Sequence, residues 1–327
     1  MEGTGAHLAP ELLNVATAEN YHMPDHAVAL RDVTKTFGAH TAVDSLDLTV
    51  TKGSVYGFIG PNGSGKTTTL RMIMRILHPD QGEIEVLGER SQDAATDRVG
   101  YLPEERGLYK QMKVRDVLAY YAELKGMRRC RGLIDSWLAR MGLSEWADKQ
   151  VVALSKGMAQ KVQFIAAVVT NPELVLLDEP FSGLDPVNMD VLREAILSLR
   201  REGTTVIFST HDMAVAEKMC DSVFMIYRGQ KVLDGTLQSI LDSHGADTIR
   251  VRVRGEAPRL DRLPGVQSLT DFGQTQELRL SAGADPQRVL AALVERATVL
   301  HFELTRPSLH DIFVRIARPE LEANAHA

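Results

Sequence analysis

Cysteine is nearly absent from this sequence of 327 residues: only Cys130 and Cys220 occur, and no CxxC pair is present. Small disulfide-stapled folds and cysteine-based zinc sites need several closely spaced cysteines. The sequence therefore excludes both classes. We expect the two cysteines to be unpaired thiols in a reducing compartment.

Long hydrophobic runs are also lacking. The longest nearly apolar stretch covers residues 162–169, whereas a membrane-spanning helix needs about 20 apolar residues. The amino terminus has neither a basic region nor an apolar run, so it does not resemble a secretion signal. We therefore expect a chain that does not itself cross a membrane, which leaves open that it serves a membrane protein.

The sequence also lacks an excess of basic residues. The net charge is −6, and the first 26 residues contain four acidic residues with no Lys or Arg. Between residues 246 and 327 there is no lysine, and 11 arginines are balanced by 11 acidic residues. Proteins that bind nucleic acid electrostatically carry clustered basic residues, so no nucleic-acid partner is expected.

What the sequence does contain is a succession of strand and helix patterns. An antiparallel pair is predicted over 222–235, turning at Arg228-Gly229. Apolar strands separated by a helix indicate a parallel sheet that is covered on both faces. The other predicted strands are 27–38, 45–50, 54–60, 82–88, 173–180 and 204–211, and helices are predicted at 66–77, 114–127 and roughly 187–202.

These patterns divide the chain into segments. Residues 27–245 are expected to form the main α/β domain, within which about 93–170 is mostly helical. Residues 246–318 contain short alternating strands and one helix, which predicts a small α+β domain. The remaining segments are a flexible acidic N-terminal tail at 1–26 and a C-terminal tail at 319–327.

A glycine-rich loop between a predicted strand and a predicted helix points to nucleotide binding. "GPNGSGKTT" (60–68) fits the pattern G-x-x-x-x-G-K-[ST]. Its glycines let backbone N–H groups surround a phosphate chain, Lys66 supplies positive charge, and Thr67 supplies a hydroxyl for Mg²⁺. The alternative, a glycine-rich turn without a ligand, is disfavoured by the strand–loop–helix context. The nucleotide-binding residues predicted here are Gly60, Pro61, Asn62, Gly63, Ser64, Gly65, Lys66, Thr67 and Thr68.

Two carboxylates end a later apolar strand, in "LVLLDEP" (174–180). In sheets of this kind the strand ends open onto the ligand crevice. We expect Asp178 to hold Mg²⁺ through its water shell, and Glu179 to orient and deprotonate an attacking water. His211 ends the next apolar strand and is expected within reach of the terminal phosphate. The alternatives are an ordinary Asp-Glu-Pro turn and a structural histidine, both less favoured beside the glycine-rich loop.

Residues 28–240 resemble the ATP-binding subunits of ABC transporters, with the motifs in that family's order. "GPNGSGKTT" resembles the Walker A loop and "LVLLDE" the Walker B strand. "LSKGM" (154–158) resembles the signature segment, and "SGLDP" (182–186) resembles the D-loop. His211 matches the family's switch histidine. Phe37 lies where the family stacks an aromatic ring on adenine, although a lone phenylalanine is more often a core residue.

The resemblance implies an α/β fold: a P-loop NTPase core of the ABC type, with a mixed sheet and a helical subdomain, followed by the small α+β domain. It also implies a head-to-tail dimer with a second copy or a paralogous ATPase subunit. Each ATP would lie between one Walker A loop and the partner's signature helix, where Ser155 and Gly157 would receive the γ-phosphate. Asp185 would lie at the dimer seam. Lys66, Glu179 and His211 would be the catalytic residues.

Two departures from the family's commonest pattern suggest a branch. Lys156 and Met158 replace a glycine and a glutamine of the signature, and Glu104 in "GYLPEERGLY" stands where a glutamine usually lies near Mg²⁺ and water. We therefore assign Thr67, Asp178 and Glu104 to the metal site. Both departures resemble two-component exporters of the sodium and drug efflux type, as does "PSLHDIF" near the C-terminus. The side chain of Lys156 is expected to turn outward.

The sequence thus predicts an ATPase, with ATP and Mg²⁺ as cofactors, that powers export through a separate integral membrane permease. It would lie at the cytoplasmic face of the membrane, with the region after Glu104 as the coupling surface. The alternative from another class is a soluble ABC ATPase that acts on nucleic acid or ribosomes. A third alternative, an ATP-binding regulator that does not hydrolyse, is disfavoured by the Asp178, Glu179 and His211 set.

Overall fold

A computed structural model describes the chain over residues 26–90, 96–105, 107–243, 245, 247–254 and 259–316. The predicted C-terminal tail at 319–327 lies outside the described residues. Of the predicted N-terminal tail at 1–26, residues 1–25 also lie outside the described residues, and His26 opens the first strand.

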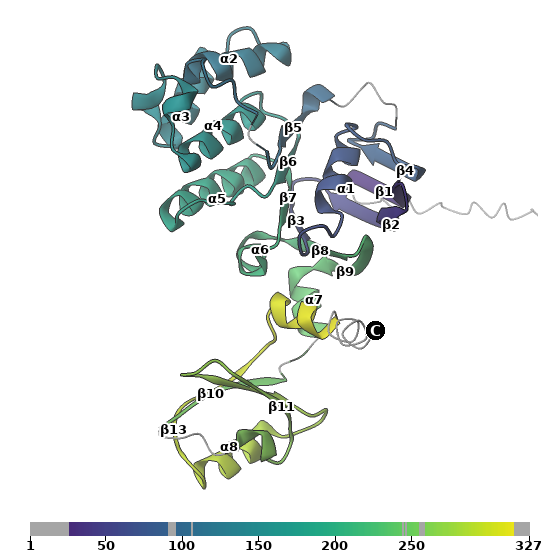
Figure 1. The fold of residues 1–327 in the computed structure, drawn as a ribbon, viewed down its shortest axis with the longest axis vertical. Helices are drawn as coiled ribbons and strands as arrows, with labels where there is room; N and C mark the ends of the chain where they lie inside the picture. The colour runs from purple at the N-terminus through teal and green to yellow at the C-terminus, as the bar shows by residue number, and fades with distance from the viewer. Residues whose placement is uncertain are drawn as a thin grey trace, which may run out of the picture.

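A six-stranded sheet forms the centre of the large domain, in the order β5-β6-β7-β3-β8-β9 (Figure 1). Every neighbouring pair is parallel except β8 and β9, which turn at Arg228-Gly229 as predicted. The strands are β3 (Val55–Ile59), β5 (Val99–Leu102), β6 (Leu174–Asp178), β7 (Thr205–Thr210), β8 (Ser222–Tyr227) and β9 (Gln230–Thr236).

Both faces of this sheet are covered, because successive side chains of a strand point to opposite faces. In β3, Tyr56 and Phe58 join one apolar core, whereas Val55 and Ile59 join the other. The first core is closed by α1 (Lys66–Ile73) and by an antiparallel sheet of β2 (His40–Thr51), β1 (His26–Phe37) and β4 (Gln81–Val86). The second is closed by α4 (Lys156–Val168), α5 (Pro186–Arg201) and α6 (Met213–Met219). The predicted covered sheet is confirmed.

The helical region contains α2 (Val114–Leu124), α3 (Arg131–Arg140) and α4, and it lies beyond the β5 edge of the sheet (Figure 1). The range 93–170, predicted as mostly helical, also contributes strand β5 to the central sheet. Three short 3₁₀ helices complete the region: Thr96–Arg98, Ser144–Trp146 and Val151–Ala153. Helix α1 ends at Ile73 rather than at residue 77, because Arg75 adopts a left-handed φ of 60°.

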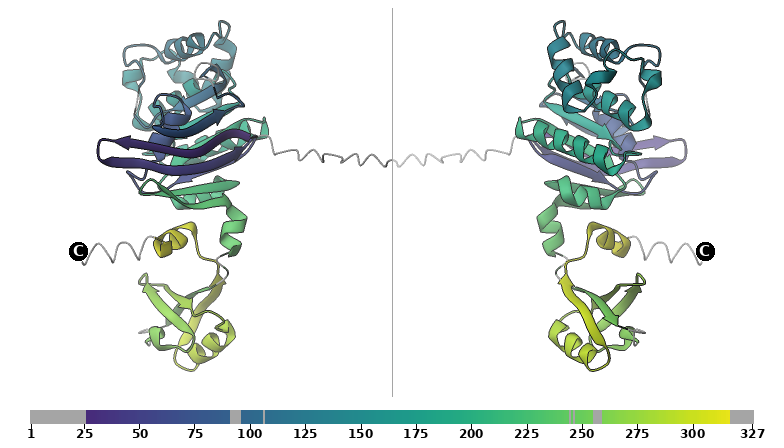
Figure 2. Two further views of the ribbon diagram at one scale, coloured as in Figure 1. Left: turned by 90° about the vertical axis from the view of Figure 1, so that its right-hand side faces the viewer. Right: turned by 90° about the vertical axis from the view of Figure 1, so that its left-hand side faces the viewer.

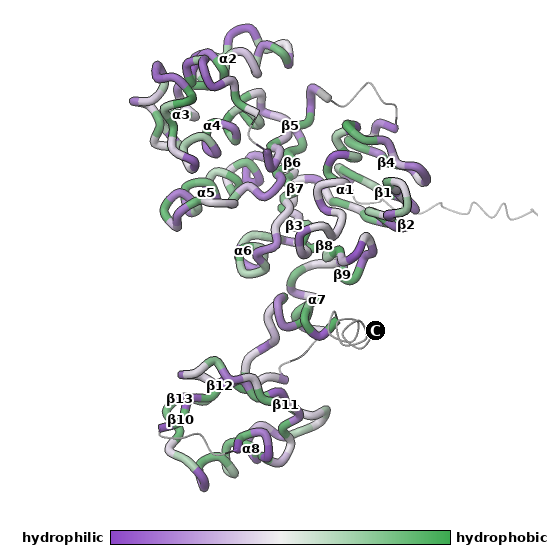
Figure 3. The backbone as a smooth tube through the Cα atoms, viewed as in Figure 1, coloured by the Kyte–Doolittle hydropathy of each residue, from purple (hydrophilic) through white to green (hydrophobic). Residues whose placement is uncertain are grey.

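None of the helices among the described residues is long and apolar enough to span a membrane. Figure 3 shows hydrophilic stretches along α2, α3 and α5. Each of these helices buries only part of its residues. Cys130 and Cys220 are unpaired, as predicted, and both are buried.

The small C-terminal unit follows α7 (Leu237–Ser243) and contains an antiparallel sheet in the order β11-β12-β10-β13. One face of this sheet packs on α8 (Pro286–Val294), with Val289 and Leu293 of the helix fully buried. The other elements are β10 (Thr248–Arg254), β11 (Val266–Asp271), β12 (Gln276–Leu280), β13 (Thr298–Thr305) and the 3₁₀ helix Leu260–Arg262.

A last helix, over 309–316, returns to the large domain and lies beside α7 rather than on the small sheet (Figure 2). Leu309 and Ile312 are fully buried in the same core as α6 and β8, and Glu217 of α6 accepts a hydrogen bond from the N–H of Leu309. Arg315 makes two hydrogen bonds of 2.9 Å to Asp247, just before β10. This helix therefore attaches the small unit to the large domain.

Ile312→Ala is expected to lower the melting temperature, because removing a fully buried Ile side chain costs about 2–5 kcal/mol. Val314→Ala on the same helix is the control, since Val314 is 40% exposed. Circular dichroism melts of both variants test the attachment, and equal melting temperatures would contradict it.

Candidate nucleotide and catalytic site

Three adjacent parallel strands, β6, β7 and β3, end at one edge of the central sheet. Asp178 is the last residue of β6 and pairs with Ser209 of β7. Gly60 directly follows β3, and His211 directly follows β7. Residues far apart in the sequence thus meet at this edge, as the sequence predicted.

The glycine-rich loop after β3 packs closely on the end of β8. A side chain at Gly60 would place its Cβ 2.2 Å from the carbonyl oxygen of Ile226, so only glycine fits. Lys66 opens α1 and is 5% exposed; its Nζ donates hydrogen bonds to the carbonyl oxygens of Gly60 (2.7 Å) and Pro61 (3.0 Å). Burial lowers the pKa of Lys66, and the nearby carboxylates, Glu179 first among them, act in the opposite direction.

Asp178 is fully buried and joins α1 to β7. Its Oδ1 accepts hydrogen bonds from Thr67 Oγ1 (3.2 Å) and Ser209 Oγ (2.6 Å). Its Oδ2 is buried and accepts no hydrogen bond from the described residues. An unsatisfied buried carboxylate oxygen beside a hydroxyl fits a hard cation such as Mg²⁺, which prefers oxygen ligands.

No group of three or more His, Cys, Asp or Glu side chains in the described part of the chain is arranged to hold a metal ion. This does not conflict with a magnesium site, because Mg²⁺ is usually bound through one or two carboxylates, with phosphates and water completing its shell.

Glu179 has a constrained backbone and a side chain that is 9% exposed. Its φ is 48°, which is unusual for a residue other than glycine and is typical of functional positions. Its N–H donates to Ser209 Oγ at 2.9 Å, while its Oε1 lies 3.0 Å from His211 Nδ1 and 3.8 Å from Lys66 Nζ. The structure therefore brings the three predicted catalytic residues together.

Ser209 was not predicted from the sequence. Its hydroxyl bonds to both carboxylate residues, donating to Asp178 and accepting from the backbone of Glu179. The sequence did contain one indication of a role for Ser209, because it is a polar residue in an apolar strand, two positions before His211. Its contact with Asp178, however, depends on the register of β6 and β7.

A cavity of about 420 Å³, within the range of ligand pockets, lies over the loop. Its lining includes Glu104, Glu179 and Phe37, which is 48% exposed. Lys35 Nζ lies 5.6 Å from the centre of the Phe37 ring. The other lining residues are His40, Ala42, Asn62, Gly63, Gly65, Lys66, Thr67 and Thr68, of which His40 and Ala42 were not predicted.

The predicted signature residues form a separate group, and none of them lines this cavity. Ser155 caps α4, its Oγ accepting from the N–H of Met158 at 3.2 Å. A side chain at Gly157 would meet Leu184 at 3.3 Å, so the helix start packs on segment 182–186. Lys156 is exposed, and its ammonium group lies over Gly183 of the same chain.

Asp185 belongs to this second group and caps α5. Its Oδ1 accepts from the N–H of Asn188 at 3.0 Å, and its Oδ2 accepts from the Asn188 side chain. These hydrogen bonds, the backbone one first, lower the pKa of Asp185. Within one chain, none of Ser155, Gly157 and Asp185 lines the nucleotide cavity.

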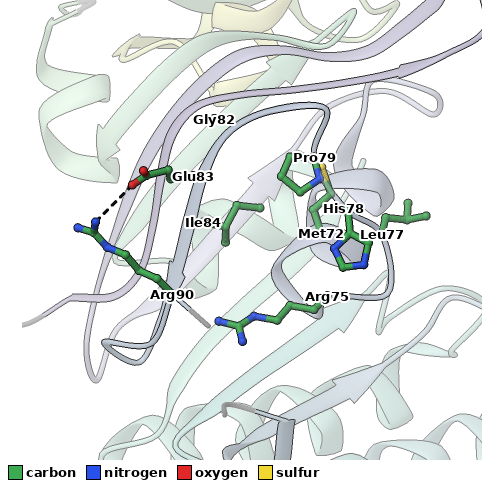
Figure 4. Close-up of a pocket in the computed structure, with 9 residues that line it drawn as sticks. All are labelled: Met72, Arg75, Leu77, His78, Pro79, Gly82, Glu83, Ile84 and Arg90. Atoms are coloured by element: carbon green, nitrogen blue, oxygen red, sulfur yellow. Dashed lines mark ion pairs between the residues drawn. The ribbon is translucent and has the colours of Figure 1, made fainter. Parts of the chain in front are cut away.

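Another cavity, of about 310 Å³, lies between the end of α1 and β4 (Figure 4). Its lining includes Arg75, His78 and an ion pair of 3.4 Å between Arg90 and Glu83. None of the predicted site residues lines it, so it is separate from the nucleotide cavity.

Comparison with known families gives two matches along the chain. Residues 43–182 match the "ABC transporter" family, and residues 235–317 match "ATP-binding protein DrrA1-3-like, C-terminal domain". The second match covers the small unit and the helix over 309–316.

Several curated relatives align over most of the chain. An uncharacterized ABC transporter ATP-binding protein, YhaQ of Bacillus subtilis, is 41% identical over 86% of this chain and 95% of its own length. Nod factor export ATP-binding protein I of Paraburkholderia xenovorans is 34% identical over 92% of this chain and all of its own length. ABC transporter ATP-binding protein NatA of Bacillus subtilis is 38% identical over 64% of this chain and 87% of its own.

A solved structure described as the ATP binding subunit of an ABC transporter superposes with a TM-score of 0.61. It shares 30% sequence identity and covers 67% of this chain and 93% of its own.

Proposed function

The chain belongs to the ATP-binding subunits of ABC transporters, which hydrolyse ATP to power transport, and we propose that it drives export through a separate membrane permease. The observation that carries the catalytic part of this proposal is the contact of Glu179 with both His211 and Lys66. The relatives named for Nod factor export support the direction of transport.

The residues at the strand ends have separable roles in this proposal. Lys66 exchanges its two carbonyl partners for the outer phosphates of ATP, since an ammonium group binds a phosphate more strongly than a neutral carbonyl. Glu179 takes a proton from the attacking water, and His211 fixes its carboxylate. Ser209 holds both carboxylate residues in place.

Mg²⁺ would be held by Asp178 and Thr67, with Glu104 at the cavity wall. The bound ion supplies positive charge that stabilises the transferring phosphoryl group. The free Oδ2 of Asp178 is the feature that supports this assignment.

The separation of the two residue groups supports a head-to-tail dimer with a second copy or a paralogous subunit. Ser155 and Gly157 open α4, whose N-terminus carries partial positive charge suited to the γ-phosphate of a partner's ATP. Asp185 lies beside them at the proposed seam. We propose the same domain limits as the sequence suggested: 27–245 for the ATPase and 246–318 for the accessory domain.

A third cavity, of about 310 Å³, is our candidate for the permease-docking site, and it is called the docking cavity below. It lies where the segment after Glu104 meets α2 and α4, and its lining includes Tyr101, Leu108, Tyr121 and Gln163. Docking there would place the chain at the cytoplasmic face of the membrane.

Reconstitution with a candidate permease in liposomes tests this function. We expect ATP-dependent flux that disappears when either protein is omitted. Affinity for DNA or ribosomes that weakens steeply with salt, without flux, would favour the alternative class instead.

Glu104→Gln is expected to preserve or raise ATP hydrolysis, by up to about threefold. Glu104 shares the cavity with Glu179 and faces the same nucleotide, so the substitution removes one negative charge from the site. Steady-state ATPase assays at saturating Mg²⁺ measure the effect. An inactive variant would show instead that the carboxylate of Glu104 has a positive role in catalysis.

A further inference from the structure

Gln163 lies inside α4, is 5% exposed, and contacts the loop that carries Glu104. Its Nε2 donates hydrogen bonds to the carbonyl oxygens of Pro103 (3.2 Å) and Glu105 (3.1 Å), on either side of Glu104. Only the NH₂ group of the amide can donate, so these two carbonyls fix which end of the amide faces the loop.

This loop separates two cavities. Glu104 lines the nucleotide cavity, whereas Pro103 and Gln163 line the docking cavity. Gln163 therefore holds the backbone on both sides of a carboxylate that lines the nucleotide cavity.

The other end of the same amide has no partner. Oε1 of Gln163 is buried and accepts no hydrogen bond from any described residue. Buried acceptors without a partner are rare in folded proteins and are costly. The hydrogen bonds that this buried amide makes are therefore those of its Nε2 to the Glu104 loop.

We propose that Gln163 is a positioning residue for Glu104. Its Nε2 holds the backbone on both sides of Glu104 and so fixes where that carboxylate lies in the nucleotide cavity. The role of Glu104 at the metal site rests on the proposed function, whereas the contacts of Gln163 concern this chain alone.

The proposal is tested with full-length protein and Mn²⁺ as a spectroscopic substitute for Mg²⁺, bound with a non-hydrolysable ATP analogue. Gln163→Leu is expected to weaken Mn²⁺ binding about tenfold, because Glu104 loses its fixed position. Electron paramagnetic resonance titration measures the free ion. In a Glu104→Ala background the same substitution should change the affinity less than about twofold, because the effect passes through Glu104.

An isosteric variant separates positioning from packing. In Gln163→Glu, an ionised carboxylate would face two carbonyl oxygens and repel them, whereas a protonated carboxyl donates one hydrogen bond. The loss of Mn²⁺ affinity relative to wild type should therefore be larger at pH 8 than at pH 6. A loss that does not change with pH would overturn the positioning role.

Gln160 provides the matched control on the same helix. It is 4% exposed, and its Nε2 donates to the carbonyl oxygen of Pro180 at 3.1 Å, away from the Glu104 loop. Gln160→Leu should leave Mn²⁺ affinity within about twofold of wild type. An equal loss in Gln160→Leu and Gln163→Leu would show a general effect on α4 and overturn the proposal.

Discussion

Glu179→Gln is expected to lower ATP turnover by about 10²–10⁴-fold while ATP still binds. The substitution keeps the size of the side chain and removes its ability to accept a proton. The structure shows why the protein should remain folded: Ser209 Oγ accepts from the backbone N–H of residue 179, which the substitution does not change. Steady-state phosphate release measures turnover, and equilibrium binding of a fluorescent ATP analogue measures affinity.

The same variant tests the dimer. Without hydrolysis, ATP should remain between the two chains, so the variant is expected to elute as a dimer with ATP and Mg²⁺ in size-exclusion chromatography. A variant that binds ATP yet stays monomeric would contradict the head-to-tail arrangement. Glu173→Gln is the matched control, because Glu173 precedes the same strand, is exposed, and pairs with Arg98 rather than with the nucleotide site. Its turnover should equal that of the wild type.

Features that depend on short stretches of sequence were predictable. The glycine-rich loop, the apolar strands β3, β6 and β7, and the turn at Arg228-Gly229 are set by neighbouring residues, so their patterns identified them. Asp178, Glu179 and His211 were predictable together because parallel strands end at the same edge of a sheet.

Features that depend on contacts between distant segments were not predictable in the same way. Ser209 gains its role from the register of β6 against β7, and Gln163 from a loop about 60 residues earlier in the chain. Strand β5 has only four residues, too few for a clear period inside a helical region. The helix over 309–316 follows the small domain in sequence, but its apolar face packs on the large domain.

Lys66→Ala is expected to weaken ATP binding at least about 100-fold and to abolish measurable turnover. Removing one member of a buried charge pair costs about 3–5 kcal/mol, and a loss of this size in binding free energy corresponds to roughly 10²–10⁴-fold in affinity. Lys66 is well placed for such an effect, because it is 5% exposed, lies 3.8 Å from Glu179, and lines the nucleotide cavity. Isothermal titration calorimetry measures the loss directly.

Lys161 is the control that separates binding from folding in this experiment. It is 6% exposed, burial lowers its pKa as it does for Lys66, and its Nζ donates to the carbonyl oxygen of Met141 at 2.8 Å. Lys161→Ala should therefore lower the melting temperature, because the carbonyl of Met141 loses a charged donor, yet leave ATP affinity within about threefold of wild type. If Lys66→Ala retained near-normal turnover, the glycine-rich loop could not be the phosphate site, because its one fixed positive charge would be dispensable.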